Sequence, residues 1–364
     1  SGVEKGSKRR GKQRLEQLTA KKPARNSNYE LLRIIAMFMI VFIHANMYLF
    51  QFVGGKSAVF YNGMVNGICN IGVTCFMLIS GYYGMKFDLA KFVRMECMMI
   101  TYSLAETVLL CLMVPGQMQG AALLEQLAKS FMPFITRKHW FYSCYVCLLF
   151  LSGYIQKFIE HLKKEEFERL LLLLLVLFSV LPTFFYFELI PDNGKGLVHM
   201  IMIYMIGRYI RMYKDVRMPK KALVLFVILW IINGVSHEIP IRIGGIYHHL
   251  CKDNSITNLI MAVILFYLFK EFTFQSGVIN RAAGSVFAVF ALNDALVLVV
   301  MKVLFDGGFH GAEGILGFLM LTGVVTAILA ACLIFGEIRR LVLDKCDRYL
   351  GNLAERKIMG WLKS

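Results

Sequence analysis

The fold is decided by the stretch LLRIIAMFMIVFIHANMYLFQF, residues 31–52. Arg33 and His44 are its only basic side chains, and it contains no acidic one. A helix needs about 20 apolar residues to cross the hydrocarbon core of a bilayer, and this stretch is long enough. It therefore predicts a membrane-spanning helix that carries two basic side chains.

Nine further apolar runs follow along the chain. We expect membrane spans at residues 31–52, 65–83, 92–114, 140–159, 170–190, 197–212, 222–235, 256–272, 284–305 and 312–335. Of the 364 residues, 57% are apolar or aromatic and 18% are charged, whereas soluble domains carry roughly 25% charged residues. One soluble core could not bury so much apolar surface. The sequence predicts an all-α fold, a polytopic transmembrane bundle of about ten helices.

Lysine and arginine residues indicate the orientation of these helices, because cytoplasmic loops are enriched in them. With the N-terminus inside, the inner segments hold 31 of the 40 basic residues and the outer loops hold 7. Both termini are therefore expected in the cytoplasm. We divide the chain into a basic disordered cytoplasmic arm (residues 1–28), the ten-helix domain (29–335) and a basic cytoplasmic tail (336–364).

The net charge of +16 would also suit a nucleic-acid partner, but the basic residues lie between the apolar runs. We therefore expect membrane lipid and no nucleic acid as a partner. Most of the nine cysteines lie within apolar runs, so no disulfide framework is expected. Cys144 and Cys147 form a CxxC pair without a second pair of ligands, which favours small packing residues over a metal site. We expect no metal.

Arg33 and His44 share one face of the first span. Their spacing corresponds to roughly 1100° of helix rotation, so only about 20° separates their directions, and they stand about 16 Å apart along the axis. This places Arg33 at the cytoplasmic edge and His44 in the outer half of the bilayer. Ionisable groups at bilayer depth are candidates for function. The alternatives are a snorkelling anchor for Arg33 and a hydrogen-bonded structural histidine for His44.

Four stretches, in this order, resemble the acyltransferase 3 family of bacterial membrane proteins. YELLRIIAMFMIVFIHA (residues 29–45) contains the arginine and histidine, separated by ten residues, that mark the family's first helix; they are Arg33 and His44. GVTCFMLISGYYG (72–84) is similar to the family's aromatic-rich run ending in Ser-Gly, and HWFYSCYVCLLFL (139–151) to its Trp-Phe/Tyr span. GLVHMIMIYMIGRYIRMY (196–213) resembles members associated with surface-polysaccharide modification.

The resemblance implies transfer of an acyl group, usually acetyl, from cytoplasmic acetyl-CoA to a hydroxyl of an extracytoplasmic or exported polysaccharide, at the inner membrane of a bacterial cell. Arg33 would assist binding of the donor, because arginine forms fork-like hydrogen bonds to phosphate. His44 would be the general base, since histidine titrates near the working pH. An extended pantetheine arm would carry the thioester from one residue to the other.

Further donor contacts are expected at the inner face. The span containing Ser80 and Tyr82 runs inward, so both lie at the level of Arg33; the alternative is close helix packing with an interfacial tyrosine. Arg208 and Arg211 stand at the inner end of another span and could bind phosphate. The alternative for these two arginines is the ordinary enrichment of positive charge on the inside.

Acceptor contacts are expected at the outer face. His199 lies near the outer end of its span and is either a second acid/base, a glycan contact or a hydrated interfacial histidine. Trp140 and Tyr142 begin a span on the outer side. They either stack on sugar or belong to an aromatic belt.

Asp294 and Glu106 fall within apolar spans, where a buried carboxylate needs a partner. Asp294 either orients His44, pairs with an arginine or makes a structural contact between helices. Many members of the family carry a Tyr-Leu-Ile-His type run in this region, whereas this chain reads FALND, residues 290–294. Asn293 then replaces the family's histidine, which increases the importance of His44 and Asp294.

Two other functions remain open. A transporter or flippase for a glycan or small metabolite would line its permeation path with the same polar residues, but it would not consume acetyl-CoA. A non-catalytic sensor or assembly subunit would tolerate loss of Arg33 and His44. The sequence leaves open the glycan, the acyl chain length, the formation of a covalent acyl-enzyme and whether the protein is a homo-oligomer.

Overall fold

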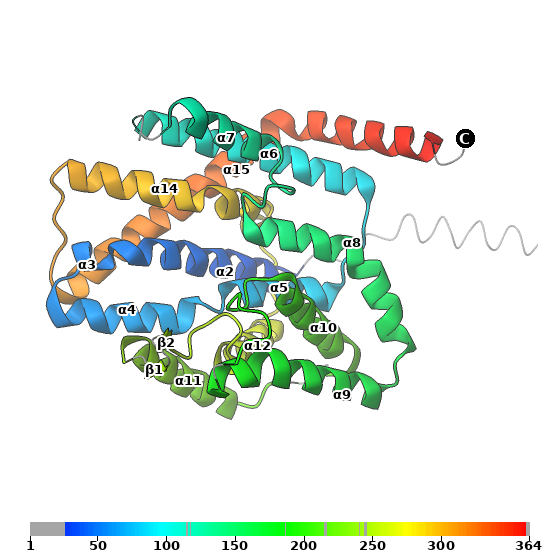
Figure 1. Cartoon of the computed structure of the whole chain (residues 1–364), viewed down its shortest axis with the longest axis horizontal. Coiled ribbons are helices and arrows are strands. Elements are labelled where there is room, and N and C mark those ends of the chain that lie inside the picture. The colour runs from blue at the N-terminus through cyan, green and yellow to red at the C-terminus, as the bar shows by residue number, and fades with distance from the viewer. Residues whose placement is uncertain are drawn as a thin grey trace, which may run out of the picture.

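The computed structural model describes residues 26–361 apart from residues 114, 115, 117, 186, 215, 216, 240, 244 and 245. Most of the described residues form helices, as Figure 1 shows. The elements are α2 (Asn28–Ala45), η1 (Asn46–Tyr48), α3 (Leu49–Phe52), α4 (Gly55–Cys69), α5 (Gly72–Tyr83), α6 (Leu89–Met113), α7 (Gly120–Phe131), α8 (Trp140–His161), α9 (Lys164–Leu175), η2 (Val176–Phe185), α10 (Leu197–Tyr213), α11 (Lys221–Glu238), β1 (Ile241–Ile243), β2 (Ile246–His248), α12 (Ile256–Glu271), α13 (Gly277–Ala283), α14 (Val286–Asp306) and α15 (Gly314–Trp361). Residues 1–25, most of the predicted cytoplasmic arm, lie outside the described residues.

The prediction of an all-α polytopic bundle is confirmed. Eight helical segments are long and apolar enough to cross a bilayer: Asn28–Phe52, Gly55–Tyr83, Leu89–Met113, Trp140–His161, Lys164–Phe185, Lys221–Glu238, Val286–Asp306 and Gly314–Ile358. Each of them overlaps one predicted span, although the predicted spans 92–114, 170–190, 284–305 and 312–335 extend beyond the helical segment at one end. The second predicted span, 65–83, covers the end of α4 and all of α5, and the helical segment extends back to Gly55. The short antiparallel hairpin of β1 and β2 was not predicted.

The two remaining predicted spans are the shorter helices α10 and α12, of 17 and 16 residues. At about 1.5 Å per residue, each is roughly 25 Å long, slightly less than the hydrocarbon core. At one end of α12, Asn28 Nδ2 donates a hydrogen bond to the carbonyl of Phe269 (3.0 Å). At the other end, Asn70 Nδ2 donates to the carbonyl of Cys251 (2.8 Å). α12 therefore runs between the two ends of the bundle, as α2 and α5 do.

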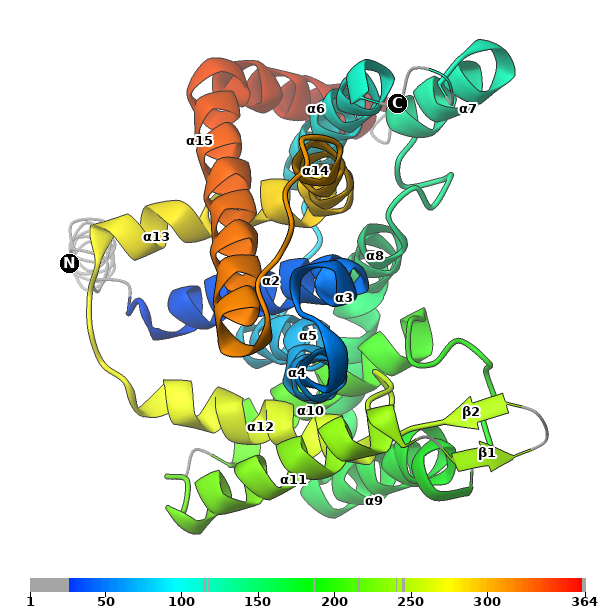
Figure 2. The same cartoon turned by 90° about the vertical axis from the view of Figure 1, so that its left-hand side faces the viewer.

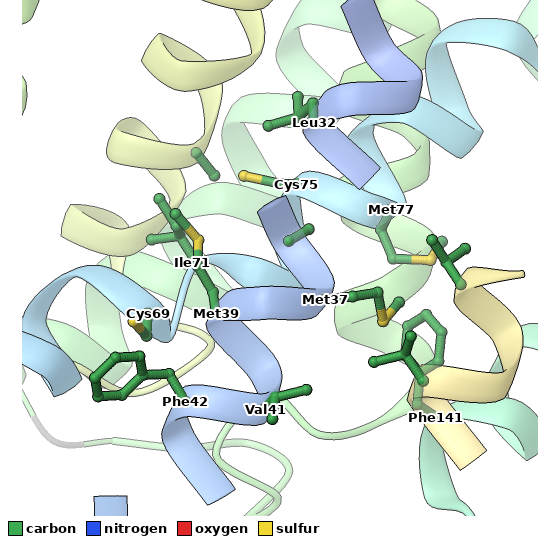
Figure 3. Close-up of a cluster of buried hydrophobic side chains, with 14 of the residues drawn as sticks. Leu32, Met37, Met39, Val41, Phe42, Cys69, Ile71, Cys75, Met77 and Phe141 are labelled. Carbon is green, nitrogen blue, oxygen red and sulfur yellow. The ribbon is translucent and has the colours of Figure 1, made fainter. Parts of the chain in front are cut away.

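Helix α2 lies at the centre of the bundle. It packs against α5, α14, α15, α4 and α12, and Figure 2 shows these helices around it. Apolar side chains on several sides of α2 are buried, which a helix surrounded by other helices requires. Figure 3 shows part of this core, with Leu32, Met37, Met39, Val41 and Phe42 of α2 beside Ile71, Cys75, Met77 and Phe141. The position of the first span is thus fixed by packing along most of its length.

Glycines allow two pairs of helices to approach closely. A Cβ atom on Gly67 of α4 would lie 2.7 Å from the backbone nitrogen of Gly234 in α11, and one on Gly63 would lie 2.6 Å from its carbonyl oxygen. A Cβ atom on Gly207 of α10 would lie 2.6 Å from the carbonyl oxygen of Leu78 in α5. Small residues at four-residue spacing are a common means of packing helices in membranes.

Helix α15 continues without a break through residue 336, where the sequence analysis separated the membrane domain from the tail. Figure 2 shows that its second half turns and runs beside α6. Arg339, which is buried, forms a salt bridge with Asp347 (2.5 Å) and donates a hydrogen bond to Thr101 Oγ1 in α6 (3.2 Å). The described part of the predicted tail is therefore attached to the bundle.

Candidate active site

His44, near the end of α2, faces two successive side chains of α14. Its Nδ1 lies 2.8 Å from Oδ1 of Asp294 and also contacts Oδ1 of Asn293. The amide of Asn293 is oriented by its own helix, because Nδ2 donates to the carbonyls of Val289 (3.0 Å) and Phe290 (2.8 Å). Two oxygens therefore face Nδ1, which assigns the proton of the neutral ring to Nδ1 and leaves Nε2 as the acceptor.

The ring of His44 lines a small cavity between α2, α5, α8 and the outer loops. Its volume is about 90 Å³, or roughly three waters at about 30 Å³ each. The wall consists mostly of apolar and aromatic side chains with three polar groups from outside the helices. The lining residues are Ile40, Ile43, His44, Cys69, Asn70, Val73, Trp140, Phe141, Lys195, Asp253 and Phe290.

Lys195 and Asp253 are charged members of this wall that the sequence analysis did not identify. They come from the loops that precede α10 and α12. Burial raises the pKa of Asp253 to about 6, although the positive charge of Lys195 opposes the shift. Charged residues in outer loops are usually solvated, so only the folding of both loops over the His44 cavity distinguishes these two.

The opposite end of α2 carries a second group of predicted site residues. Arg33 Nη1 forms a salt bridge with Oε1 of Glu30 (2.7 Å). One turn earlier, the ring of Tyr29 lies 5.6 Å from that of Tyr82 in α5. Tyr82 in turn contacts α10, because its hydroxyl accepts a hydrogen bond from Arg211 Nη1 (3.1 Å). The N-terminal end of α2 and the C-terminal ends of α5 and α10 therefore meet here.

Arg208 joins the same group, donating from Nη1 to the carbonyl of Tyr82 (3.4 Å). The guanidinium of Arg211 also lies 5.1 Å from the centre of the Tyr82 ring. Ser80 is buried and donates to the carbonyl of Phe76 within α5 (3.1 Å). The structure thus brings Tyr82, Arg208 and Arg211 together. Arg33 lies one helical turn from Tyr29, whose ring contacts that of Tyr82, and Ser80 lies in the adjacent turn of α5. We call Arg33, Tyr82, Arg208 and Arg211 the arginine cluster.

A family profile described as an acyltransferase domain matches residues 26–337. The chain belongs to the acyltransferase 3 family. No curated protein and no solved structure matches it. The matched segment contains every helix from α2 to the first half of α15, and with them both His44 and the arginine cluster. This membrane protein is therefore an acyltransferase.

Of the three outer residues singled out in the sequence, only Trp140 lines the His44 cavity of this acyltransferase. Tyr142 is buried, and its hydroxyl donates a hydrogen bond to Glu96 of α6. His199 is also buried and lines a separate cavity of about 10 Å³ beside Glu188 and Asn254. Neither Tyr142 nor His199 reaches the cavity that His44 faces.

Glu106, the other intramembrane carboxylate, finds its partner outside the spans. Lys138 Nζ lies 3.1 Å from Oε2 of Glu106 and donates to Ser130 Oγ (2.9 Å). His139 Nε2 lies 3.6 Å from the same carboxylate oxygen. The pairing explains how a carboxylate in the middle of α6 is tolerated, since a buried charge needs a partner.

Proposed function

We propose that this acyltransferase moves an acetyl group from acetyl-CoA on the cytoplasmic side to a hydroxyl of a polysaccharide on the outer side of a bacterial inner membrane. Family membership gives the reaction class, acyl transfer between molecules. The observation that carries the proposal is the position of His44. Its Nδ1 lies 2.8 Å from Asp294, and its ring borders a cavity at the end of α2 that is far from the arginine cluster.

In the proposed reaction, Nε2 of His44 takes the proton from the acceptor hydroxyl as its oxygen attacks the thioester carbonyl carbon. The new C–O bond forms, the C–S bond breaks, and the thiolate of CoA leaves with the proton returned by His44. Asp294 acts as an orienting residue, because its carboxylate at 2.8 Å stabilises the imidazolium formed between these two proton transfers.

The donor is proposed to bind with its phosphates at the arginine cluster. Arginine suits this task because its guanidinium forms paired hydrogen bonds with phosphate oxygens. Arg33 and His44 stand about 16 Å apart along α2, a distance that an extended pantetheine arm covers. The nucleotide would stay at the inner face while the thioester reaches the small cavity.

The proposal is tested by incubating the purified protein with isotopically labelled acetyl-CoA and surface glycans from the source cell. We expect label in the glycan with the wild type, and a rate about 10²–10⁴-fold lower with His44→Gln, the usual cost of losing a general base. Acetyl-CoA affinity should not change, because the arginine cluster is distant. His161→Gln is the matched control, since His161 is exposed at the inner end of α8.

An active His44→Gln enzyme would contradict the general-base role, because an amide keeps hydrogen bonding but cannot take up the proton. A wild-type protein that binds glycan without consuming acetyl-CoA would instead favour the transporter.

A further inference from the structure

The His44 cavity is too small for the acceptor. Its volume of about 90 Å³ accommodates roughly three waters, enough for an acetyl group or a hydroxyl but not for a whole sugar ring with its hydroxyls. If the proposed function holds, the glycan must therefore bind in an adjoining space and extend only its reacting hydroxyl toward His44.

A larger cleft adjoins the cavity at Lys195, which lines both. The cleft has a volume of about 630 Å³. One wall is the segment between α7 and α8, the floor is the first turns of α8, and the other wall is the loop before α10. We call it the outer cleft; the residues used below are Arg137, Ser143, Cys144, Asp192 and Lys195.

The outer cleft presents positive charge. Arg137 and Lys195 are exposed, and neither forms a salt bridge with any carboxylate in the described part of the chain. Their neighbours Lys138 and Lys252 are both paired, with Glu106 and Glu188 respectively. The N-terminus of α10 also opens into the cleft at Leu197 and adds the positive end of its dipole.

The nearest carboxylate in the cleft is already engaged by the backbone. Oδ1 of Asp192 accepts a hydrogen bond from the N–H of Gly194 (2.8 Å), which holds the loop before α10 in its turn. Asp192 therefore shapes this wall but keeps its negative charge, so the charged side chains that line the cleft are two cations, Arg137 and Lys195, and one carboxylate.

The backbone on both sides of the outer cleft is strained. Among the described residues, Arg137 (φ 52°) and Asn193 (φ 54°) are the non-glycine residues with a left-handed backbone. This conformation is costly for residues with a Cβ atom and persists where the surroundings impose it, often at ligand sites. Arg137 belongs to one wall and Asn193 to the loop that forms the other.

We propose that the outer cleft binds the acceptor glycan, and that Arg137 and Lys195 select a glycan with a carboxylate or phosphate near the acylated hydroxyl. The proposal rests on the proposed function and specifies its substrate class. Lys195 lies at the boundary between cleft and cavity, so an anion bound to it places the neighbouring hydroxyl in front of His44. Ser143 and Cys144 leave room on the floor for the sugar.

The test measures acetyl transfer by the full-length protein in lipid nanodiscs to three samples of source-cell glycan: untreated, carboxyl-reduced and dephosphorylated. We expect one of the two treatments to raise KM for the glycan about tenfold or more, which identifies the anion. Arg137→Gln and Lys195→Gln should each raise KM for untreated glycan about tenfold, or about 1.4 kcal/mol. Arg137→Lys should keep the wild-type KM, because it restores the charge at the same backbone position.

Two readouts and a control variant separate this role from a structural one. Acetyl-CoA affinity should be unchanged in both glutamine variants, which also shows that they are folded. Added salt should raise KM for the wild type and have a smaller effect on the double variant, because screening acts on exposed charges. Lys56→Gln, an exposed lysine at the start of α4 outside the cleft, is the control and should behave as wild type.

Equal transfer to all three glycan samples, or unchanged KM in both glutamine variants, overturns the selection of an anionic acceptor while leaving the proposed function intact. A wild-type protein that labels none of the three samples overturns the proposed function and this inference together.

Discussion

Asn293 and Asp294 both contact the same nitrogen of His44, Nδ1, but they differ in charge and in how firmly their side chains are held. Asp294 carries the charge, but other residues leave 69% of its side-chain surface uncovered, so few neighbours hold the carboxylate in place. The amide of Asn293 is neutral but is fixed by two carbonyls of α14. In the proposed reaction, the charged oxygen would stabilise the imidazolium, while the fixed oxygen would hold the ring in place. Asn293 therefore has a structural role here.

At the level of single residues, Arg33 is the first proposed donor contact to test. We expect Arg33→Ala to weaken acetyl-CoA binding about tenfold or more, because hydrogen bonds to charged groups contribute about 1.5–3 kcal/mol. Arg33→Lys should restore only part of the affinity, since the fork of the guanidinium is lost. Calorimetry in detergent measures the acetyl-CoA affinity of both variants. Arg281→Ala removes a comparable arginine, paired with Glu337 on the exposed surface, and should leave affinity unchanged.

The cavity wall supplies a prediction about pH. Because burial raises the pKa of Asp253 from 3.8 to about 6, the folded state holds this proton more tightly than the unfolded chain does. The protonated carboxyl of Asp253 therefore contributes its whole stabilisation below about pH 4, and this stabilisation is lost as the pH rises through 6. We expect Asp253→Asn to remove this loss. Between pH 4 and 7, the free energy of unfolding of the variant should therefore rise relative to that of the wild type by at most about 3 kcal/mol. Thermal unfolding at several pH values measures it; parallel curves would contradict the shift.

At the level of helices, close packing explains why α4 extends well before the predicted second span. Residues 55–64 look too polar for the membrane, with Asn62 among them, yet they form a helix against α11. Asn62 is satisfied by neighbours, since its amide donates to Oε1 of Glu238 (2.5 Å) and accepts from Asn46 Nδ2 (2.7 Å). Contacts with another helix thus replace the hydrophobicity that the sequence lacks.

We expect Gly67→Val to separate α4 from α11 and to destabilise the protein by about 1–3 kcal/mol, the usual cost of overpacking. The added Cβ would lie 2.7 Å from the nitrogen of Gly234 and 2.9 Å from the carbonyl oxygen of Trp230, and backbone atoms of a packed helix cannot move aside easily. Gly153→Val is the matched control, because a Cβ on Gly153 in α8 meets no atom within 4 Å. Equal melting temperatures for the two variants would refute the close contact.

At the level of the whole molecule, the orientation in the membrane follows from the distribution of basic residues. We expect reporters fused at residues 5 and 360 to lie in the cytoplasm, and one inserted within residues 116–120 to lie outside. The physical reason is the excess of lysine and arginine in the inner segments. A reporter at residue 360 that reads outside would contradict the ten-span model.

The sequence predicted what depends on one helix and missed what depends on how helices and loops pack. Apolar runs locate spans because lipid sets their length, and the Arg33–His44 face follows from helix geometry alone. The pairing of His44 with Asp294 was one of several options, because the two residues are brought together only when α14 packs on α2. No pattern in the sequence marked Lys195 and Asp253 as site residues, since their loops become part of the site only by folding over it.

Helix α2 runs without a break from Asn28 to Ala45, with Arg33 near one end and His44 near the other. Each residue inserted between them would advance the helix by about 1.5 Å and rotate all that follows by about 100°. One insertion would turn His44 away from Asp294, although the helix would remain equally apolar. Seven would restore the direction but displace the ring by about 10 Å, well beyond hydrogen-bonding distance. Natural variants of this segment should therefore differ by substitution at lipid-facing or core positions and never by a change in length.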